Sequence, residues 1–92
     1  MGTMRLDKFL KVSRIIKRRT LAKEVADQGR ITINGTAGKA SSNVKEGDEL
    51  TIRLGQRVLT VRIEKLQETT RKEEAAGMYT LIKEERLNQI NE

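Results

Sequence analysis

The residues of this chain that could do chemistry are mostly cationic, and they gather in its first third. Between Arg5 and Arg30 there are nine basic and three acidic residues, whereas the ten basic and ten acidic residues after Arg30 cancel. The densest group is the run Lys17–Arg19, and Lys23 follows one helical turn later. An ordinary soluble surface mixes both signs of charge, so this separation favours docking on a polyanion. A solvated basic helix face is the alternative.

The remaining reactive side chains do not form a catalytic or metal-binding set. The chain contains neither histidine nor cysteine, which removes the commonest metal ligands and the side chain that titrates near neutrality. The paired carboxylates Asp48-Glu49, Glu73-Glu74 and Glu84-Glu85 are adjacent in sequence, so on a helix or strand their side chains diverge. We therefore predict a binding protein, not an enzyme, with no metal and no cofactor.

Composition narrows the class of partner. No segment approaches the ~20 apolar residues of a membrane span, and the apolar residues among the cations are needed for the core, so no membrane partner is expected. The single Phe and single Tyr disfavour recognition of single strands by stacked bases. Structured RNA or DNA, bound through shape and phosphate, is favoured. The lack of cysteine fits a cytoplasmic protein.

The hydrophobic pattern predicts one α+β domain, in which two helices precede a small, mostly antiparallel sheet. Apolar residues recur at helical spacing over Leu6–Ser13 and again over residues 19–28. Gly29 is placed to end the second helix in a left-handed conformation. The inward stripe of that helix is predicted to comprise Leu21, Ala22, Val25 and Ala26.

The period then changes from helical to alternating. Strands are predicted at residues 31–33, 49–54 and 57–64, with tight turns at Asn34-Gly35 and Gly55-Gln56. The order of elements is therefore helix, helix, then strands joined by short hairpins.

The C-terminal part is expected to add a short helix and an edge strand. Thr70 is a candidate cap for a helix through Ala76, which Gly77 would end. A strand is predicted over Met78–Ile82, and residues 87–92 are expected to fray.

Four stretches, in this order, resemble the alpha-L RNA-binding motif, also called the S-four-type domain. They are Arg5–Leu10 (RLDKFL), Arg18–Ala22 (RRTLA), Gly29–Gly35 (GRITING) and Gly47–Leu50 (GDEL). The resemblance implies two helices packed on a small sheet, with RNA bound by the helices. We assign this domain to residues 4–66 and a C-terminal extension to residues 67–92, and we interpret residues 1–3, which precede a second methionine, as an expression scar.

Within that superfamily, the RLDKFL opening and residues 69–76 and 78–80 resemble a family of ribosome quality-control factors from Gram-positive bacteria, related to a heat-shock ribosome-associated family. The resemblance implies binding to large ribosomal subunits obstructed by peptidyl-tRNA, with contacts to ribosomal RNA and tRNA. It also implies support for template-free, poly-alanine tailing of stalled chains beside a tailing factor on the same subunit. Off the ribosome we expect a monomer.

Three other functions stay open from the sequence. The protein could act as a heat-shock-type recycling factor that binds the same subunits without promoting tailing. Related domains occur in pseudouridine synthases, although this chain ends before a catalytic domain could begin. The basic helices could instead bind an acidic protein.

The charge pattern and the resemblance together predict the site. Asp7 is expected to cap the first helix or to orient Arg5 or Arg19 as an ion-pair partner. Carried over by position, Arg5 and Asp7 match the opening motif, Lys39 matches a basic loop position, and Arg19 matches the RNA-contacting arginine at the start of the second helix, with Lys17, Arg18 and Lys23 around it. Together with the other basic residues of the first third, the predicted RNA-binding residues are Arg5, Lys8, Lys11, Arg14, Lys17, Arg18, Arg19, Lys23 and Lys39.

Overall fold

Two helices form where the spacing of apolar residues predicts them. The structure, a computed structural model, describes residues 2–67 and 71–86. Helix α1 spans Leu6–Val12 and helix α2 spans Arg19–Asp27, so each ends one residue before its predicted end. Gly29 has the left-handed conformation expected after α2, with φ of 78°. The residues that the helices bury include Leu6, Phe9 and Leu10 from α1 and Ala22, Val25 and Ala26 from α2.

The prediction that Leu21 belongs to the inward stripe of α2 is wrong. The residue is 47% exposed, among the most exposed large apolar residues of the described chain. At 3.6 residues per turn, Leu21 lies about 90° around the helix from the middle of the stripe formed by Ala22, Val25 and Ala26. Two of those three residues are alanines, which let α2 approach its neighbours closely. Leu21 therefore lies at the edge of the buried face of the helix.

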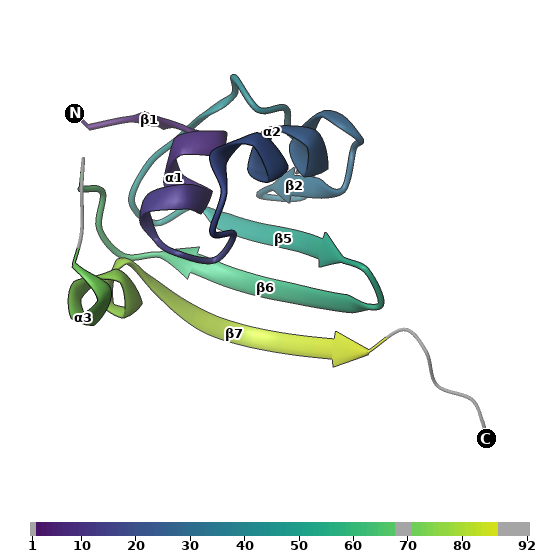
Figure 1. The fold of residues 1–92 in the computed structure, drawn as a ribbon. Helices are drawn as coiled ribbons and strands as arrows, with labels where there is room; N and C mark the ends of the chain where they lie inside the picture. Colours follow the sequence, from purple (N-terminus) through teal and green to yellow (C-terminus); the bar gives the residue numbers. More distant parts are fainter. Residues whose placement is uncertain (1, 68–70, 87–92) are drawn as a thin grey trace.

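Five strands form one sheet in the order β3-β2-β5-β6-β7, with every pairing antiparallel. Figure 1 shows α1 and α2 toward the β2 side of this sheet and β7 at the opposite edge. The α+β fold is as predicted. The strands are β2 (Ile31–Ile33), β3 (Thr36–Ala37), β5 (Glu49–Leu54), β6 (Arg57–Ile63) and β7 (Tyr79–Arg86).

Both predicted tight turns are present. Asn34 and Gly35 have φ of 52° and 86°, the pair of left-handed residues that a two-residue hairpin requires. Gly55, between β5 and β6, has φ of 61°.

A second, two-stranded sheet was not predicted. Strand β1 (Met4–Arg5) pairs antiparallel with β4 (Asn43–Val44). The Leu6 N–H continues this contact by donating to the carbonyl of Ser42 at 2.7 Å. Strands of two residues are too short to show a period, so the pattern of the sequence held no sign of them. Their pairing fixes the start of α1 against the segment after β3.

The core lies between the two helices and the sheet. Its largest fully buried side chains come from α1 and from β2, β5 and β6, and Met78 closes the end near β7. Gly38 is also buried, and a Cβ added there would lie 2.8 Å from Ile33 Cδ1. Position 38 therefore has no room for a side chain unless Ile33 moves.

The C-terminal part differs in detail from the prediction. Helix α3 spans Lys72–Ala75 with Arg71 at its N-cap position, and Thr70, the predicted cap, lies outside the described residues. Gly77 does not end the helical segment, because it lies inside a 3₁₀ helix, η1 (Ala76–Met78).

The predicted edge strand is present but longer. Strand β7 begins at Tyr79 and extends to Arg86, four residues beyond the predicted end. Its last residues are charged and exposed, so no apolar alternation marked them as a strand. Backbone pairing with β6 and an ion pair from Arg57 Nε to Glu84 Oε2 (3.0 Å) hold them. The predicted fraying of residues 87–92 concerns residues outside the described part.

Candidate nucleic-acid interface

Two arginines from different elements meet on one buried carboxylate. Arg5 ends β1, Asp7 lies in the first turn of α1, and Arg19 opens α2. Arg5 donates from Nε and Nη2 to the two oxygens of Asp7, each at 3.2 Å, and Arg19 donates from Nη2 to Oδ1 at 3.4 Å. The N-cap of α1 is Arg5, so Asp7 acts as an ion-pair partner and not as the cap. We call these three residues the arginine pair site.

The electrostatics of this site keep Asp7 ionised. Burial of the carboxyl would by itself raise its pKa, but the hydrogen bonds from Arg5 and the positive charge of Arg19 outweigh that effect, and the pKa of Asp7 is lowered. The Lys8 N–H adds a further donor to Oδ1 at 2.8 Å. One negative charge is thus fixed beneath two positive charges.

The arrangement suits phosphate binding. The Asp7 side chain is 4% exposed, whereas those of Arg5 and Arg19 are 48% and 49% exposed. Each guanidinium has five N–H donors and uses one or two of them on Asp7, so donors remain for an outside acceptor. The carboxylate restrains both guanidiniums, which reduces the rotamer entropy lost when a phosphate binds.

The loop that holds Lys39 lies beside the start of α1. The Ala40 carbonyl accepts from the Asp7 N–H at 3.2 Å, and the Ala40 N–H donates to Asp27 Oδ1, at the end of α2, at 3.1 Å. Lys39 is exposed, and its N–H donates to Ser42 Oγ at 2.9 Å. One short loop therefore contacts both helices and presents a lysine next to them.

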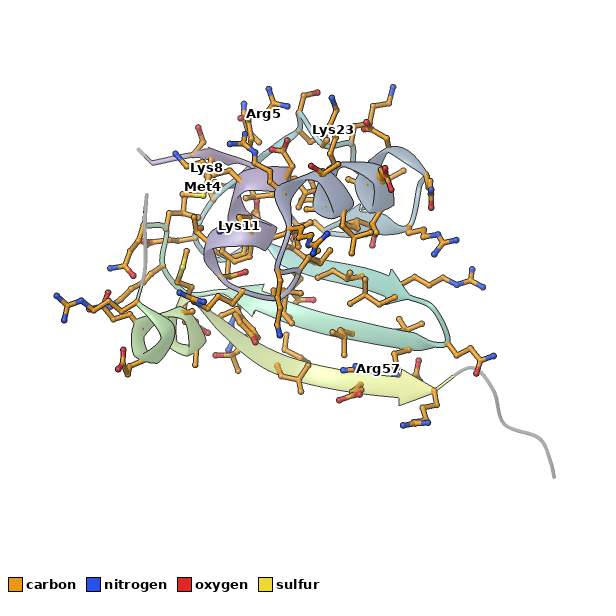
Figure 2. All side chains as sticks on the ribbon, in the orientation of Figure 1. Met4, Arg5, Lys8, Lys11, Lys23 and Arg57 are labelled. Carbon is orange, nitrogen blue, oxygen red and sulfur yellow. The ribbon has the colours of Figure 1, made fainter. Side chains whose placement is uncertain are left out.

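The other predicted RNA-binding residues lie on the same two helices and the loop between them. Lys8 is half-buried, and the rest are exposed. In Figure 2, Arg5 and Lys23 lie on the side of the molecule formed by β1 and α2, with Lys8 and Lys11 along α1, and Arg57 lies far from them near the end of β7. The exposed members on the helices and their connecting loop are Lys11, Arg14, Lys17, Arg18 and Lys23.

A second buried carboxylate is structural. Asp48 accepts from Asn34 Nδ2 at 3.1 Å and from Lys45 N and Nζ at 3.0 and 3.2 Å. Burial would raise the pKa of Asp48, but these hydrogen bonds, led by that from the Lys45 N–H, lower it overall. Asn34 Oδ1 in turn accepts from the Glu49 N–H at 2.9 Å. The NG and GDEL stretches thus lock the hairpin turn to β5.

Two further features, a cluster of metal-ligating side chains and a membrane-spanning helix, are not found in the described residues. Among residues 2–67 and 71–86, no group of three or more acidic side chains could hold a metal ion. Within the same ranges, no helix is long and apolar enough to span a membrane.

Comparison with known proteins places this geometry in a family. The S4 domain model matches residues 4–50. The chain is 71% identical over 86 residues to the "RQC P-site tRNA stabilizing factor" of Bacillus subtilis, covering 94% of this chain and 100% of that protein. It is 61% identical over 87 residues to the protein of that name from Listeria monocytogenes, covering 95% of each.

A solved structure agrees with the fold. The trimeric structure of Vibrio cholerae Heat Shock Protein 15 superposes with a TM-score of 0.80 at 34% identity, covering 87% of this chain and 82% of that one. The likeness extends past the S4 domain match to most of the described sheet.

Proposed function

Because this chain belongs to the S4-domain family and, within it, to the RQC P-site tRNA stabilizing factors, we propose that it binds large ribosomal subunits obstructed by peptidyl-tRNA. It contacts both ribosomal RNA and the tRNA, and it supports template-free poly-alanine tailing of the stalled chain by a tailing factor on the same subunit. The observation that supports this proposal most directly is the arginine pair site, in which two half-exposed guanidiniums are held on one buried carboxylate.

The proposed mechanism is positional and not catalytic. The basic surface of α1, α2 and the Lys39 loop spans two RNA surfaces and thereby stabilises one placement of the tRNA. Neutralising about five to seven phosphates corresponds to a slope of log affinity against log salt of roughly −4 to −6. Attraction of this kind does not distinguish one RNA from another. Selectivity comes from shape, because the two RNA surfaces are adjacent only on the obstructed subunit.

Deletion of the gene tests the tailing role. In a bacterium that encodes this chain, we expect deletion to remove alanine tails from stalled products, and re-expression of the wild-type chain to restore them. Cosedimentation of the protein with large subunits in lysate is expected to vanish after nuclease treatment. Persistence of the protein in a nuclease-resistant complex would indicate an acidic protein partner instead.

A second candidate function rests on the structural similarity to Heat Shock Protein 15. In that role the protein binds obstructed subunits and promotes their recycling without tailing. Gene deletion distinguishes the two. Retention of alanine tails after deletion, together with accumulation of large subunits that still hold peptidyl-tRNA, would favour this candidate over tailing.

A further inference from the structure

A pocket outside the arginine pair site combines cations with the only tyrosine of the chain. It lies between the loop that joins α1 to α2 and the segment from α3 to the start of β7, and it has a volume of about 480 Å³. Figure 1 shows this segment at the end of the sheet where β7 begins. The residues that line the pocket are Ser13, Arg14, Lys17, Ala75, Ala76 and Tyr79.

The charge of this pocket is of one sign. Arg14 and Lys17 contribute two cations, both exposed, and neither has an ion-pair partner within residues 2–67 and 71–86. The small side chains of Ala75, the last residue of α3, and Ala76, the first residue of η1, complete this wall, and no acidic residue is among the described residues that line the pocket. The described residues that line the pocket therefore offer an anionic ligand two cations and no carboxylate.

Arg14 holds its position at a conformational cost. Its φ is 65°, in the left-handed region where glycine is the usual residue after a helix. Its N–H donates to the Lys11 carbonyl at 3.1 Å, which closes the end of α1. A glycine would meet the backbone requirement without strain, so the helix end alone gives no reason for a side chain at this position. An arginine here points to a use for its charge.

Tyr79 supplies a fixed aromatic surface opposite these cations. It is half-buried and packs against the core, and its pairing with Ile63 fixes it at the first position of β7. An aromatic ring held in this way can stack on a nucleobase without losing much side-chain freedom. The volume is within the range of pockets that enclose small ligands, and a single nucleotide is of that size.

We propose that this pocket holds one unstacked nucleotide of RNA, with its base on Tyr79 and its phosphate between Arg14 and Lys17. The choice of RNA as the ligand rests on the proposed function, which the arginine pair site supports through other residues. The pocket thus gives the domain a contact with an irregular RNA feature, a bulge or an end, in addition to helical phosphates.

The chain allows a direct optical test, because it has one tyrosine and no tryptophan. Stacking of a base on Tyr79 quenches its fluorescence, so titration of the full chain with adenosine 5′-monophosphate at low salt is expected to give saturable quenching, after correction for absorption by the nucleotide. Ribose 5-phosphate is the matched control without a base and should not quench. Equal signals from the two compounds would overturn the proposal.

Two variants test the assigned contacts. Arg14→Gly is expected to raise the thermal midpoint by a few degrees while weakening nucleotide binding about tenfold, a combination that a purely structural role cannot produce. Tyr79→Leu, with binding followed by backbone amide shifts, should weaken it about tenfold, and Tyr79→Phe should keep it within about twofold. Unchanged binding in Arg14→Gly and Tyr79→Leu would refute the proposal.

The failure of this proposal can be told apart from failure of the proposed function. Arg19→Gln should reduce association with large subunits while leaving adenosine 5′-monophosphate binding unchanged. If Arg19→Gln releases the subunit but Tyr79→Leu binds the nucleotide normally, the pocket is not a nucleotide site and the proposed function stands. If nucleotide binding depends on Tyr79 but the chain never associates with large subunits, the proposed function fails instead.

Discussion

Arg19 donates a hydrogen bond to the carboxylate of Asp7, twelve residues earlier in the chain, with 3.4 Å between Nη2 and Oδ1. This contact joins the first residue of α2 to the first turn of α1, and Arg5 completes it from β1. The same groups that orient the cations therefore also connect three elements of the fold. A substitution at this site affects stability and binding together, and experiments must separate the two effects.

We expect Asp7→Asn to lower the free energy of unfolding by about 1–2 kcal/mol near neutral pH, because hydrogen bonds to a charged group are lost while the arginines stay half-solvated. Urea unfolding measures this. Asn keeps the volume, so cavity formation does not contribute. No loss of stability would show that the arginines gain as much from water as from Asp7.

The stability of the protein is expected to fall in acid because of Asp7 and Asp48. Each has a folded-state pKa below the usual value of 3.8, so its contribution is present above that pH and is lost as the pH falls through the folded pKa. The drop between pH 5 and pH 2 should be smaller in Asp7→Asn than in wild type, and Asp48 should account for part of the remainder. An equal drop in both proteins would contradict the lowered pKa of Asp7.

The turn between β2 and β3 offers a test of the Asn34–Asp48 contact. Asn34→Ala loses the side-chain hydrogen bonds to Asp48 and Glu49 and also puts alanine, which tolerates the left-handed region less well than asparagine, at φ of 52°, so we expect a loss of about 2 kcal/mol. Asn34→Gly loses only the hydrogen bonds and should cost about 1 kcal/mol less. Thermal or urea unfolding of both variants gives the comparison. If Gly is no better than Ala, strain at this residue is negligible.

The length and order of the elements could be predicted largely from the sequence, because α1, α2, β5 and β6 each have a clear apolar period. The pairing of β1 with β4 could not, since each strand has two residues. Leu21 was misplaced because it lies four residues before Val25, which is a helical spacing, although it lies at the edge of the buried face of α2 and is exposed. For the site, the residue types of Arg5, Asp7 and Arg19 were readable, but their meeting at one carboxylate depends on the tertiary fold.

Close packing at Gly38 is open to a double-mutant test. Gly38→Ala should cost about 1–2 kcal/mol, because its Cβ would lie 2.8 Å from Ile33 Cδ1 and 3.1 Å from Cγ1. Ile33→Val removes Cδ1, so the cost of Gly38→Ala should shrink in that background. Gly77→Ala is the control, since nothing lies within 4 Å of its added Cβ. Additive effects of the two substitutions would show that Ile33 does not limit position 38.

The central claim is that the arginine pair site binds RNA on the large subunit, and the affinity of Arg19→Gln for subunits that hold peptidyl-tRNA tests it most directly. The matched control is Arg53→Gln, which removes an equal charge from an exposed residue of β5. Arg53 directly follows buried Ile52, so its side chain lies on the face of the sheet opposite to that of Ile52. We predict that Arg19→Gln weakens binding at least tenfold and reduces the slope of log affinity against log salt by about one. Its thermal midpoint should stay within a few degrees of wild type. Arg53→Gln should bind nearly as wild type does. Equal affinities for the two folded variants would contradict the claim.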